Sequence, residues 1–259
     1  MQAKKYLGQH WLRDLPSLEA MCDAARVSAG DEIFEIGPGM GDLTAQLMAR
    51  DTNIFALEFD PEAVKYLSQQ FALQWDVCLH VEQGDIRKFN FSALPNQYKI
   101  VANIPYYLTA NLLRILTESK HKPAIAALLV QKEVAERVAA KPGHMSAVSV
   151  ISQFYYEVSV GQVIPAKLFL PPPKVDSQIL ILKKRGKVLF EDVDQKSFFR
   201  LVIIGFANRR KTLLNSLSSG LNLSKSEIAV LLGMAKINTN ARPQELSLND
   251  WHQLFLALK

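Results

Sequence analysis

The stretch EIFEIGPGMGD, residues 32–42, decides the fold that the sequence predicts. Its first five residues, Glu32 to Ile36, have the length and the β-branched and aromatic content of a buried strand. Three glycines at alternate positions follow, and an apolar helical pattern runs from Leu43 to Met48. A strand that passes through a glycine-rich turn into a helix is the opening unit of a parallel α/β sheet, whose turn lets the backbone approach a nucleotide-like ligand.

The same alternation of strand and helix continues through the first 130 residues. Further strands are predicted at 53–57, 79–82, 99–102 and 125–130, and helices at 61–70, 110–117 and 132–139. Two later runs, at 158–163 and 178–182, alternate like an antiparallel hairpin that closes one edge of the sheet. The segment between them, 164–177, contains four prolines and is predicted to be a loop.

The chain changes character near residue 185. No β-rich run follows, and the remaining patterns, at 198–206, 225–232 and 248–258, are helical. Residues 1–182 hold 17 Lys and Arg against 19 Asp and Glu, whereas residues 183–259 hold 13 against 6. The excess positive charge in the last third would suit phosphate binding, although a merely soluble basic surface looks the same. We therefore predict two domains, residues 1–185 and 186–259.

The composition excludes several other classes of protein. A content of 49% hydrophobic and 21% charged residues is that of an ordinary globular protein. No apolar run approaches the roughly 20 residues that span a bilayer, and the amino terminus lacks the apolar stretch of a signal peptide. A cytoplasmic monomer is expected. The two cysteines and five histidines are scattered without ligand spacing, so neither a disulfide framework nor a metal site is expected.

Acidic side chains surround the glycine turn and restrict the kind of ligand it can hold. Its GxGxG spacing differs from the GxGxxG of dinucleotide sites, and Glu35 and Asp42 would repel a pyrophosphate. A ligand without phosphates that bears an amine and a sulfonium fits better. Glu58, 21 residues after Gly37, can accept both hydroxyls of a ribose, and Asp85 can accept an adenine amino group. A solvated strand end and an ordinary Gly-Asp turn remain the alternatives for these two carboxylates.

The residues Asn103-Ile104-Pro105-Tyr106 directly follow the fourth strand of the predicted sheet. An adenine amine is a poor nucleophile because its lone pair is delocalised, so acceptors aimed at its two protons must make it more pyramidal. The Asn103 side-chain oxygen and the Ile104 carbonyl, freed by Pro105, can supply them, and Tyr106 can stack on the base. Asn is not a strong base, so we expect catalysis by alignment and electrostatics. The alternative is a proline turn with a packed tyrosine.

These motifs belong to a resemblance that runs nearly end to end. The chain resembles the small-subunit rRNA adenine dimethyltransferases, which modify two adjacent adenosines near the 3′ end of bacterial 16S rRNA. The matching segments are KYLGQHWL (5–12), EIGPGMGDLT (35–44), NIPYY (103–107), VQKEVAER (130–137), FLPPPKVDS (169–177) and FANRRKTL (206–213). The family usually reads Gln-Asn-Phe-Leu where this chain has Gln9-His10-Trp11-Leu12.

The resemblance implies a Rossmann-like class I methyltransferase domain, with a seven-stranded, mostly parallel sheet, and a small all-helical C-terminal domain. Residues 1–185 are implied to bind S-adenosylmethionine as methyl donor, without a metal. The candidate cofactor-binding residues are His10, Leu12, Gly37, Gly39, Glu58, Asp85 and Asn103. Tyr106 and Phe169 are implied to sandwich the target adenine, so the candidate catalytic residues are Asn103, Ile104, Pro105, Tyr106 and Phe169.

The implied partner is 16S rRNA in an immature small ribosomal subunit, bound by the basic residues 186–259. The cluster Arg209, Arg210 and Lys211 is expected to contact RNA phosphates, helped by Lys4, Lys5 and the basic run at 183–187. Three consecutive charges at a helix start can also be merely solvated. Recognition would rest on shape and backbone, with the reactive base taken out of its stack.

Two other functions share parts of this pattern. An adenine methyltransferase of 23S rRNA, of the macrolide-resistance type, has the same catalytic motif, and the combination of residues 103–106 with the 169–177 segment separates the two. A ribosome-assembly factor with incidental catalysis would keep its function after Asn103→Ala.

Overall fold

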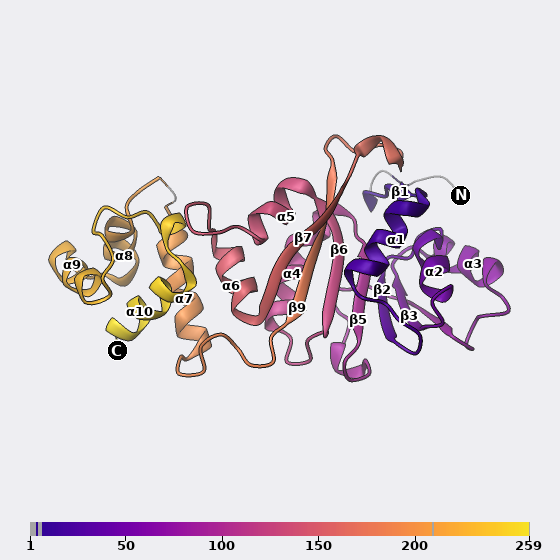
Figure 1. The fold of residues 1–259 in the computed structure, drawn as a ribbon, viewed down its shortest axis with the longest axis horizontal. Coiled ribbons are helices and arrows are strands. Elements are labelled where there is room, and N and C mark those ends of the chain that lie inside the picture. The colour runs from indigo at the N-terminus through magenta and orange to yellow at the C-terminus, as the bar shows by residue number, and fades with distance from the viewer. Residues whose placement is uncertain (1–3, 5–6, 209, 259) are drawn as a thin grey trace. The chain divides into compact units, whose positions relative to one another are not determined.

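The apolar runs predicted as strands assemble into one seven-stranded sheet, with the order β4-β3-β2-β5-β6-β9-β7 (Figure 1). This computed structural model describes residue 4, residues 7–208 and residues 210–258. The strands are β2 (Glu32–Ile36), β3 (Asn53–Glu58), β4 (Leu79–Gln83), β5 (Lys99–Asn103), β6 (Ile125–Gln131), β7 (Tyr156–Ile164) and β9 (Ser177–Lys184). Strands β2 to β6 pair in parallel, and β9 is antiparallel to β6. The predicted fold class, with a mostly parallel sheet, is confirmed.

The strand order reverses between β2 and β5, because the chain builds β3 and β4 on one side of β2 before returning to its other side. In doubly wound sheets, ligands bind at this switch point, beyond the carboxyl ends of the strands. The central strands are mostly apolar because both of their faces are covered, and all side chains from Ala126 to Val130 in β6 are fully buried.

The crossover helices occupy the places that the sequence predicts, each within about one residue. They are α2 (Asp42–Met48), α3 (Pro61–Gln70), α4 (Thr109–Glu118) and α5 (Lys132–Val138). An additional helix, α1 (Leu15–Ala24), was not predicted; Asp14 caps it by accepting a bond from the Ser17 N–H at 3.1 Å. It packs against α2, β6 and β9.

The segment 164–177 is more ordered than the predicted loop. It contains a short helical turn, η4 (Ala166–Leu168), and the strand β8 (Phe169–Leu170), which pairs antiparallel with β1 (Trp11–Leu12). Leu12 lies opposite Phe169 in this pair. The prediction of a loop is therefore wrong for these residues, because the strand partner lies at the other end of the domain in sequence and leaves no local pattern.

A second unit contains the C-terminal helices. Its members are α6 (Ala147–Tyr155), α7 (Gln195–Phe206), α8 (Leu213–Leu221), α9 (Lys225–Met234), the turn η5 (Pro243–Glu245) and α10 (Leu248–Ala257). Contacts group Glu136–Tyr156 with the residues from Arg185 onward, and the other described residues with Glu157–Lys184. Residues 136–156 thus join the helical unit rather than the sheet, which the sequence does not predict. The division at residue 185 into independently folding domains stays a prediction.

Two glycines in helices of the second unit are expected to respond oppositely to a methyl group. A Cβ on Gly205 in α7 would overlap Cη2 of the fully buried Trp251, whereas one on Gly233 in α9 would meet nothing within 4 Å. Gly205→Ala should lower the free energy of unfolding by about 1–3 kcal/mol. Gly233→Ala should raise it by about 0.5–1 kcal/mol, the ordinary gain in a helix. Urea unfolding of both variants checks this, and a stabilised Gly205→Ala protein would contradict the packing.

Candidate active site

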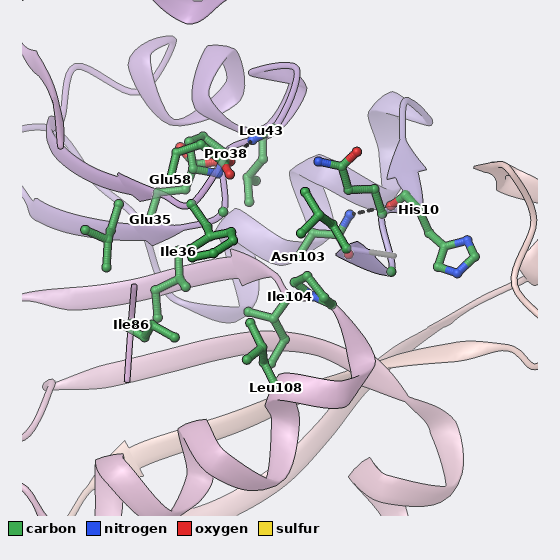
Figure 2. A pocket seen from close by; sticks show the side chains of 18 of the residues that line it. His10, Glu35, Ile36, Pro38, Leu43, Glu58, Ile86, Asn103, Ile104 and Leu108 are labelled. Carbon is green, nitrogen blue, oxygen red and sulfur yellow. Dashed lines mark hydrogen bonds between the residues drawn. The ribbon is translucent and has the colours of Figure 1, made fainter. Parts of the chain in front are cut away.

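One pocket lies at the carboxyl ends of β2, β3, β4 and β5, where the strand order reverses (Figure 2). The turns after these strands form its wall together with residues 7–12 of the amino-terminal segment. The structure thereby brings together ten of the predicted site residues, which are His10, Leu12, Gly37, Gly39, Glu58, Asp85, Asn103, Ile104, Pro105 and Tyr106. Their individual roles stay predictions.

The glycine turn after β2 has a backbone that other residues rarely adopt. Gly37, Gly39 and Gly41 have φ angles of 69°, 57° and 82°. Gly41 is also the N-cap of α2, and a Cβ there would lie only 2.5 Å from the Phe71 ring. The backbone conformation therefore favours glycine at all three positions, and at Gly41 the packing against Phe71 also requires it.

Glu58, at the end of β3, fastens the glycine turn to the next loop. Its Oε2 accepts a hydrogen bond from the Gly39 N–H at 3.0 Å, and its Oε1 accepts one from the Asp60 N–H at 2.8 Å. Burial raises the pKa of this carboxyl, while the backbone donors oppose that rise. Each oxygen keeps a second lone pair, so Glu58 can still accept bonds from the hydroxyls of a ligand.

Glu35, on β2, is the most deeply buried acid of the pocket, with only 1% of its surface exposed. Its Oε2 accepts a hydrogen bond from Thr44 Oγ1 at 2.7 Å. Burial, which outweighs that bond, and the nearby charge of Glu58 raise the pKa of Glu35 to about 8. Glu35 is thus largely protonated at neutral pH in the protein without ligands, and a bound cation would favour its ionisation.

The raised pKa predicts a pH-dependent stability. In the unfolded chain the Glu35 carboxyl ionises near its ordinary value of 4.5, whereas the folded protein keeps the proton up to about pH 8. Glu35 therefore makes its full contribution to the free energy of unfolding below pH 4.5, the pKa of the unfolded chain. This contribution is lost as the pH rises from 4.5 to about 8. Glu35→Gln stays neutral, so its melting temperature relative to wild type should increase from about pH 5 to about pH 8. Calorimetry at both pH values checks this; a constant difference would show that Glu35 is ionised throughout.

Asp85 lies in the pocket wall but is already engaged. Both of its carboxylate oxygens accept hydrogen bonds from the Arg87 guanidinium, at 2.6 to 3.0 Å. The backbone N–H of Arg87 also donates to Asp85 Oδ1. This partner holds the pKa of Asp85 below its usual range. Arg87 lines the pocket too, although the sequence did not single it out. Asp85 therefore has less capacity for a ligand amine than the sequence suggests.

The Asn103 amide has a defined orientation. Its Nδ2 donates a hydrogen bond to the His10 carbonyl at 3.2 Å (Figure 2). A carbonyl can only accept, so the amide nitrogen must face His10, and the oxygen is the end left to accept a bond. Ile104 follows and is buried, and Pro105 begins the short helical turn η3 (Tyr106–Leu108) as its N-cap.

The two predicted base-stacking aromatics are placed differently. Tyr106 lines the pocket, its hydroxyl lies 2.7 Å from Ser177 Oγ, and its ring stacks on the His10 ring. Phe169 is 3% exposed, belongs to the hydrophobic core and is not among the residues that line the pocket. Its contact with a target base stays a prediction, and in this conformation the core covers its ring.

Some functional candidates were missed by the sequence reasoning. Phe59 and Tyr107 both line the pocket and are 54% and 57% exposed. The Nε1–H of Trp11 is buried and has no hydrogen-bond partner within the described ranges, and a Cβ on Gly39 would lie 3.6 Å from it. Each of the three is next in sequence to a predicted site residue, and this position in the sequence could have identified it.

Lys4 is held by acidic residues of the same unit. Lys4 forms ion pairs with the buried Asp60 at 2.9 Å and with Glu62 at 3.0 Å, and its N–H donates to Gln9 Oε1 at 2.8 Å. The hydrogen bond to Asp60 raises the pKa of Lys4. Lys4, which the sequence suggested for phosphate contact, is thus engaged within its own domain.

Other described residues that are expected to bind RNA lie at the surface. Arg210 and Lys211 are exposed, whereas Lys5 and Arg209 lie outside the described residues. Lys183 pairs with Glu157 at 3.1 Å and Lys187 with Glu191 at 3.3 Å, both at the surface. RNA contact by the 209–211 cluster therefore stays a prediction. In the described part of the chain, no group of acidic, His and Cys side chains could hold a metal ion, and no helix could span a membrane.

The whole chain is similar to known ribosomal RNA methyltransferases. A family model described as ribosomal RNA adenine dimethylase matches residues 1–259. The Ribosomal RNA small subunit methyltransferase A of a Dehalococcoides mccartyi strain is 38% identical, over 99% of this chain and 88% of the relative. The protein of the same name from Lactococcus lactis is 36% identical, over 98% and 90%.

Solved structures show the same fold. A dimethyladenosine transferase from Plasmodium falciparum superposes with a TM-score of 0.81 at 24% identity, over 95% of this chain and 96% of the other. The 23S rRNA methyltransferase ErmE superposes with a TM-score of 0.78, also at 24% identity, over 96% and 99%. At this level of identity the structures establish the fold and leave the substrate open.

Proposed function

The chain belongs to the ribosomal RNA adenine dimethylase family, and from that premise we propose that it dimethylates two adjacent adenosines near the 3′ end of 16S rRNA. The methyl groups pass from S-adenosylmethionine to the N6 amines, giving N6,N6-dimethyladenosines. The substrate is an immature small subunit in the cytoplasm, and the enzyme acts as a monomer. The orientation of the Asn103 amide, whose oxygen is left as a free acceptor at the pocket, carries this proposal.

The residues of the pocket fit S-adenosylmethionine. Its positive charge suits a wall that contains the carboxyls of Glu58 and Asp42, and would favour ionisation of Glu35. Among the described residues the Trp11 Nε1–H has no hydrogen-bond partner, so it offers a donor to a ligand bound at the glycine turn. Glu58 would hold the ribose hydroxyls, and the glycine turn would approach the methionine part. When bound, the cofactor supplies an electrophilic methyl group on a positively charged sulfur.

The protein's own contribution to the reaction is to hold the adenine amine. Asn103 Oδ1 and the Ile104 carbonyl accept its two hydrogens, which localises the nitrogen lone pair on the side opposite these acceptors. Tyr106 supports the base by stacking. An amide is not a strong base, so the proton leaves the amine for water after the N–C bond has formed, and alignment is the main source of rate.

The basic helical region supports binding of the rRNA in this proposal. Arg209, Arg210 and Lys211 would contact phosphates, whose neutralisation gives affinity without sequence preference. Selection of the small-subunit rRNA then depends on the shape of the target and on the removal of the base from its stack. The names of the curated relatives favour the small subunit over 23S rRNA as the substrate.

The proposed function is tested by transfer of labelled methyl groups from S-adenosylmethionine to undermethylated small subunits, naked 16S rRNA and naked 23S rRNA. We expect labelling of the small subunit, and primer extension should stop at two adjacent adenosines near the 3′ end of its rRNA. Labelling of 23S rRNA alone would replace the proposal with the macrolide-resistance type of activity. Absence of label from every rRNA, with normal RNA binding, would leave only a binding role.

A further inference from the structure

His10 joins three parts of the candidate site, all in the unit that contains the sheet. Its carbonyl accepts the hydrogen bond from Asn103 Nδ2 at 3.2 Å. Its Nδ1 lies 2.7 Å from the Pro171 carbonyl oxygen. Its ring stacks on the Tyr106 ring, with 5.7 Å between the ring centroids and 23° between the planes. A single residue of the amino-terminal segment therefore contacts the catalytic motif twice and the proline-rich segment once.

The contact with Pro171 requires a hydrogen on one nitrogen of the imidazole. A carbonyl oxygen can only accept, so His10 Nδ1 must carry a hydrogen, and in the neutral ring Nε2 does not. The ring is thereby held at one edge by a directional bond and at one face by Tyr106. In Figure 2 it points away from Glu35 and Glu58, the acids of the glycine-turn side. This geometry does not direct the imidazole at a ligand held by those acids.

The proline-rich segment is fixed to the same place by its backbone. Trp11 pairs with Leu170 and Leu12 with Phe169 in the β1–β8 ladder, so the contact of the His10 side chain with Pro171 extends this connection by one residue in each strand. On its other side, Tyr106 is anchored by the contact between its hydroxyl and Ser177 Oγ. The Tyr106 ring is thus held between the imidazole at one face and Ser177 at its hydroxyl.

We propose that the His10 side chain is a positioning residue for the target adenine: it sets the orientation of Tyr106 relative to the Phe169–Pro171 segment. This deepens the proposed function and rests on it. It also reassigns His10, which the family resemblance implies as a cofactor contact. The His10 carbonyl positions Asn103 independently of the side chain, so a change of side chain should disturb Tyr106 and leave the Asn103 amide in place.

Two variants separate the two contacts of the ring. His10→Ala removes both the stacking and the Nδ1–H donor, whereas His10→Phe keeps an aromatic ring and removes only the donor. We expect kcat/KM for undermethylated small subunits to fall roughly tenfold for His10→Ala and roughly threefold for His10→Phe, as for the loss of one or two weak contacts. The dissociation constant of S-adenosylhomocysteine, measured by calorimetry, should stay within about twofold of wild type for both variants.

A double-mutant cycle tests whether His10 acts through Tyr106. In a Tyr106→Ala background, His10→Ala should cause no further loss of kcat/KM, because the ring it positions is gone. An equal loss in both backgrounds would overturn the proposal. So would a weakening of S-adenosylhomocysteine binding that accounts for the whole loss, since His10 would then be a cofactor contact.

A spectroscopic readout keeps this test independent of activity. With 3-fluorotyrosine incorporated, the 19F resonance of Tyr106, assigned through Tyr106→Phe, should shift in His10→Ala and stay closer to wild type in His10→Phe. An unchanged resonance in His10→Ala would refute the positioning role even if no rRNA were methylated. Inactivity of the wild-type protein on small subunits, with the shift observed, would refute the proposed function and leave the contact between His10 and Tyr106 supported.

Discussion

Asn103→Ala should lower kcat for methyl transfer to the small subunit by a factor on the order of 10²–10³, the cost of removing one preorganised polar group from a reacting centre. The lost acceptor is the amide oxygen that the bond from Nδ2 to the His10 carbonyl leaves available. Without it, one hydrogen of the adenine amine has no partner, and its lone pair stays delocalised into the ring. Single-turnover transfer of labelled methyl groups, with enzyme in excess, measures this step.

The matched variant Asn103→Asp distinguishes the acceptor from the donor. It keeps an oxygen toward the amine but directs a second oxygen at the His10 carbonyl, so the side chain must turn away from its present position. We expect a loss intermediate between wild type and Asn103→Ala. Binding of RNA and of S-adenosylhomocysteine should persist in both variants. A kcat for Asn103→Ala within about threefold of wild type would contradict the proposed role of the Asn103 oxygen.

Glu58→Ala should weaken S-adenosylhomocysteine binding by roughly 10- to 100-fold, the range for hydrogen bonds to a charged group. Two effects combine, because the carboxylate is expected to hold the ribose and also holds the glycine turn through the Gly39 N–H. Glu58→Gln should not rescue the affinity fully. Both oxygens of Glu58 face backbone N–H donors, so the amide nitrogen of glutamine would meet either Gly39 or Asp60 donor to donor.

A nearby acid provides the control for this variant. Glu62→Gln changes a carboxylate on α3 that is 67% exposed and pairs with Lys4, and it should leave the cofactor affinity within about twofold of wild type. Isothermal titration gives both affinities, and filter binding should show that the affinity for RNA is unchanged. If Glu58→Ala bound S-adenosylhomocysteine as tightly as wild type, the ribose would have to be held elsewhere.

The elements that the sequence predicts best are those with strong local signals. The strand Glu32–Ile36 and the helix Pro61–Gln70 match their predicted bounds, because an apolar run and a proline at the first helical position identify them without reference to the rest of the chain. The missed helix α8 (Leu213–Leu221) contains three serines, an asparagine and a glycine, all poor helix formers, and packing against α7 and α9 compensates for them. The β1–β8 pair gave no local signal either.

In the candidate site, too, the residues with a local sequence signal were predicted and those without one were not. The glycine turn, Glu58 and Asn103 were identified because each directly follows a predicted strand, and the carboxyl ends of parallel strands meet at one edge of a sheet. The partners that orient them were not identified. The bond between His10 and Asn103, the stacking of His10 on Tyr106 and the ion pair of Lys4 with Asp60 join residues that are far apart in the chain. Only the folded chain brings these pairs together.

The central claim is that one pocket holds the methyl donor against the glycine turn and presents the Asn103 oxygen to the adenine amine. A crystal structure of the protein with S-adenosylhomocysteine and adenosine tests it most directly. We expect the ribose hydroxyls on Glu58, the sulfur beside the turn at Gly37, and the adenosine N6 within hydrogen-bond distance of Asn103 Oδ1. Binding of either molecule outside this pocket, or an Asn103 amide turned with its nitrogen toward the base, would contradict the account.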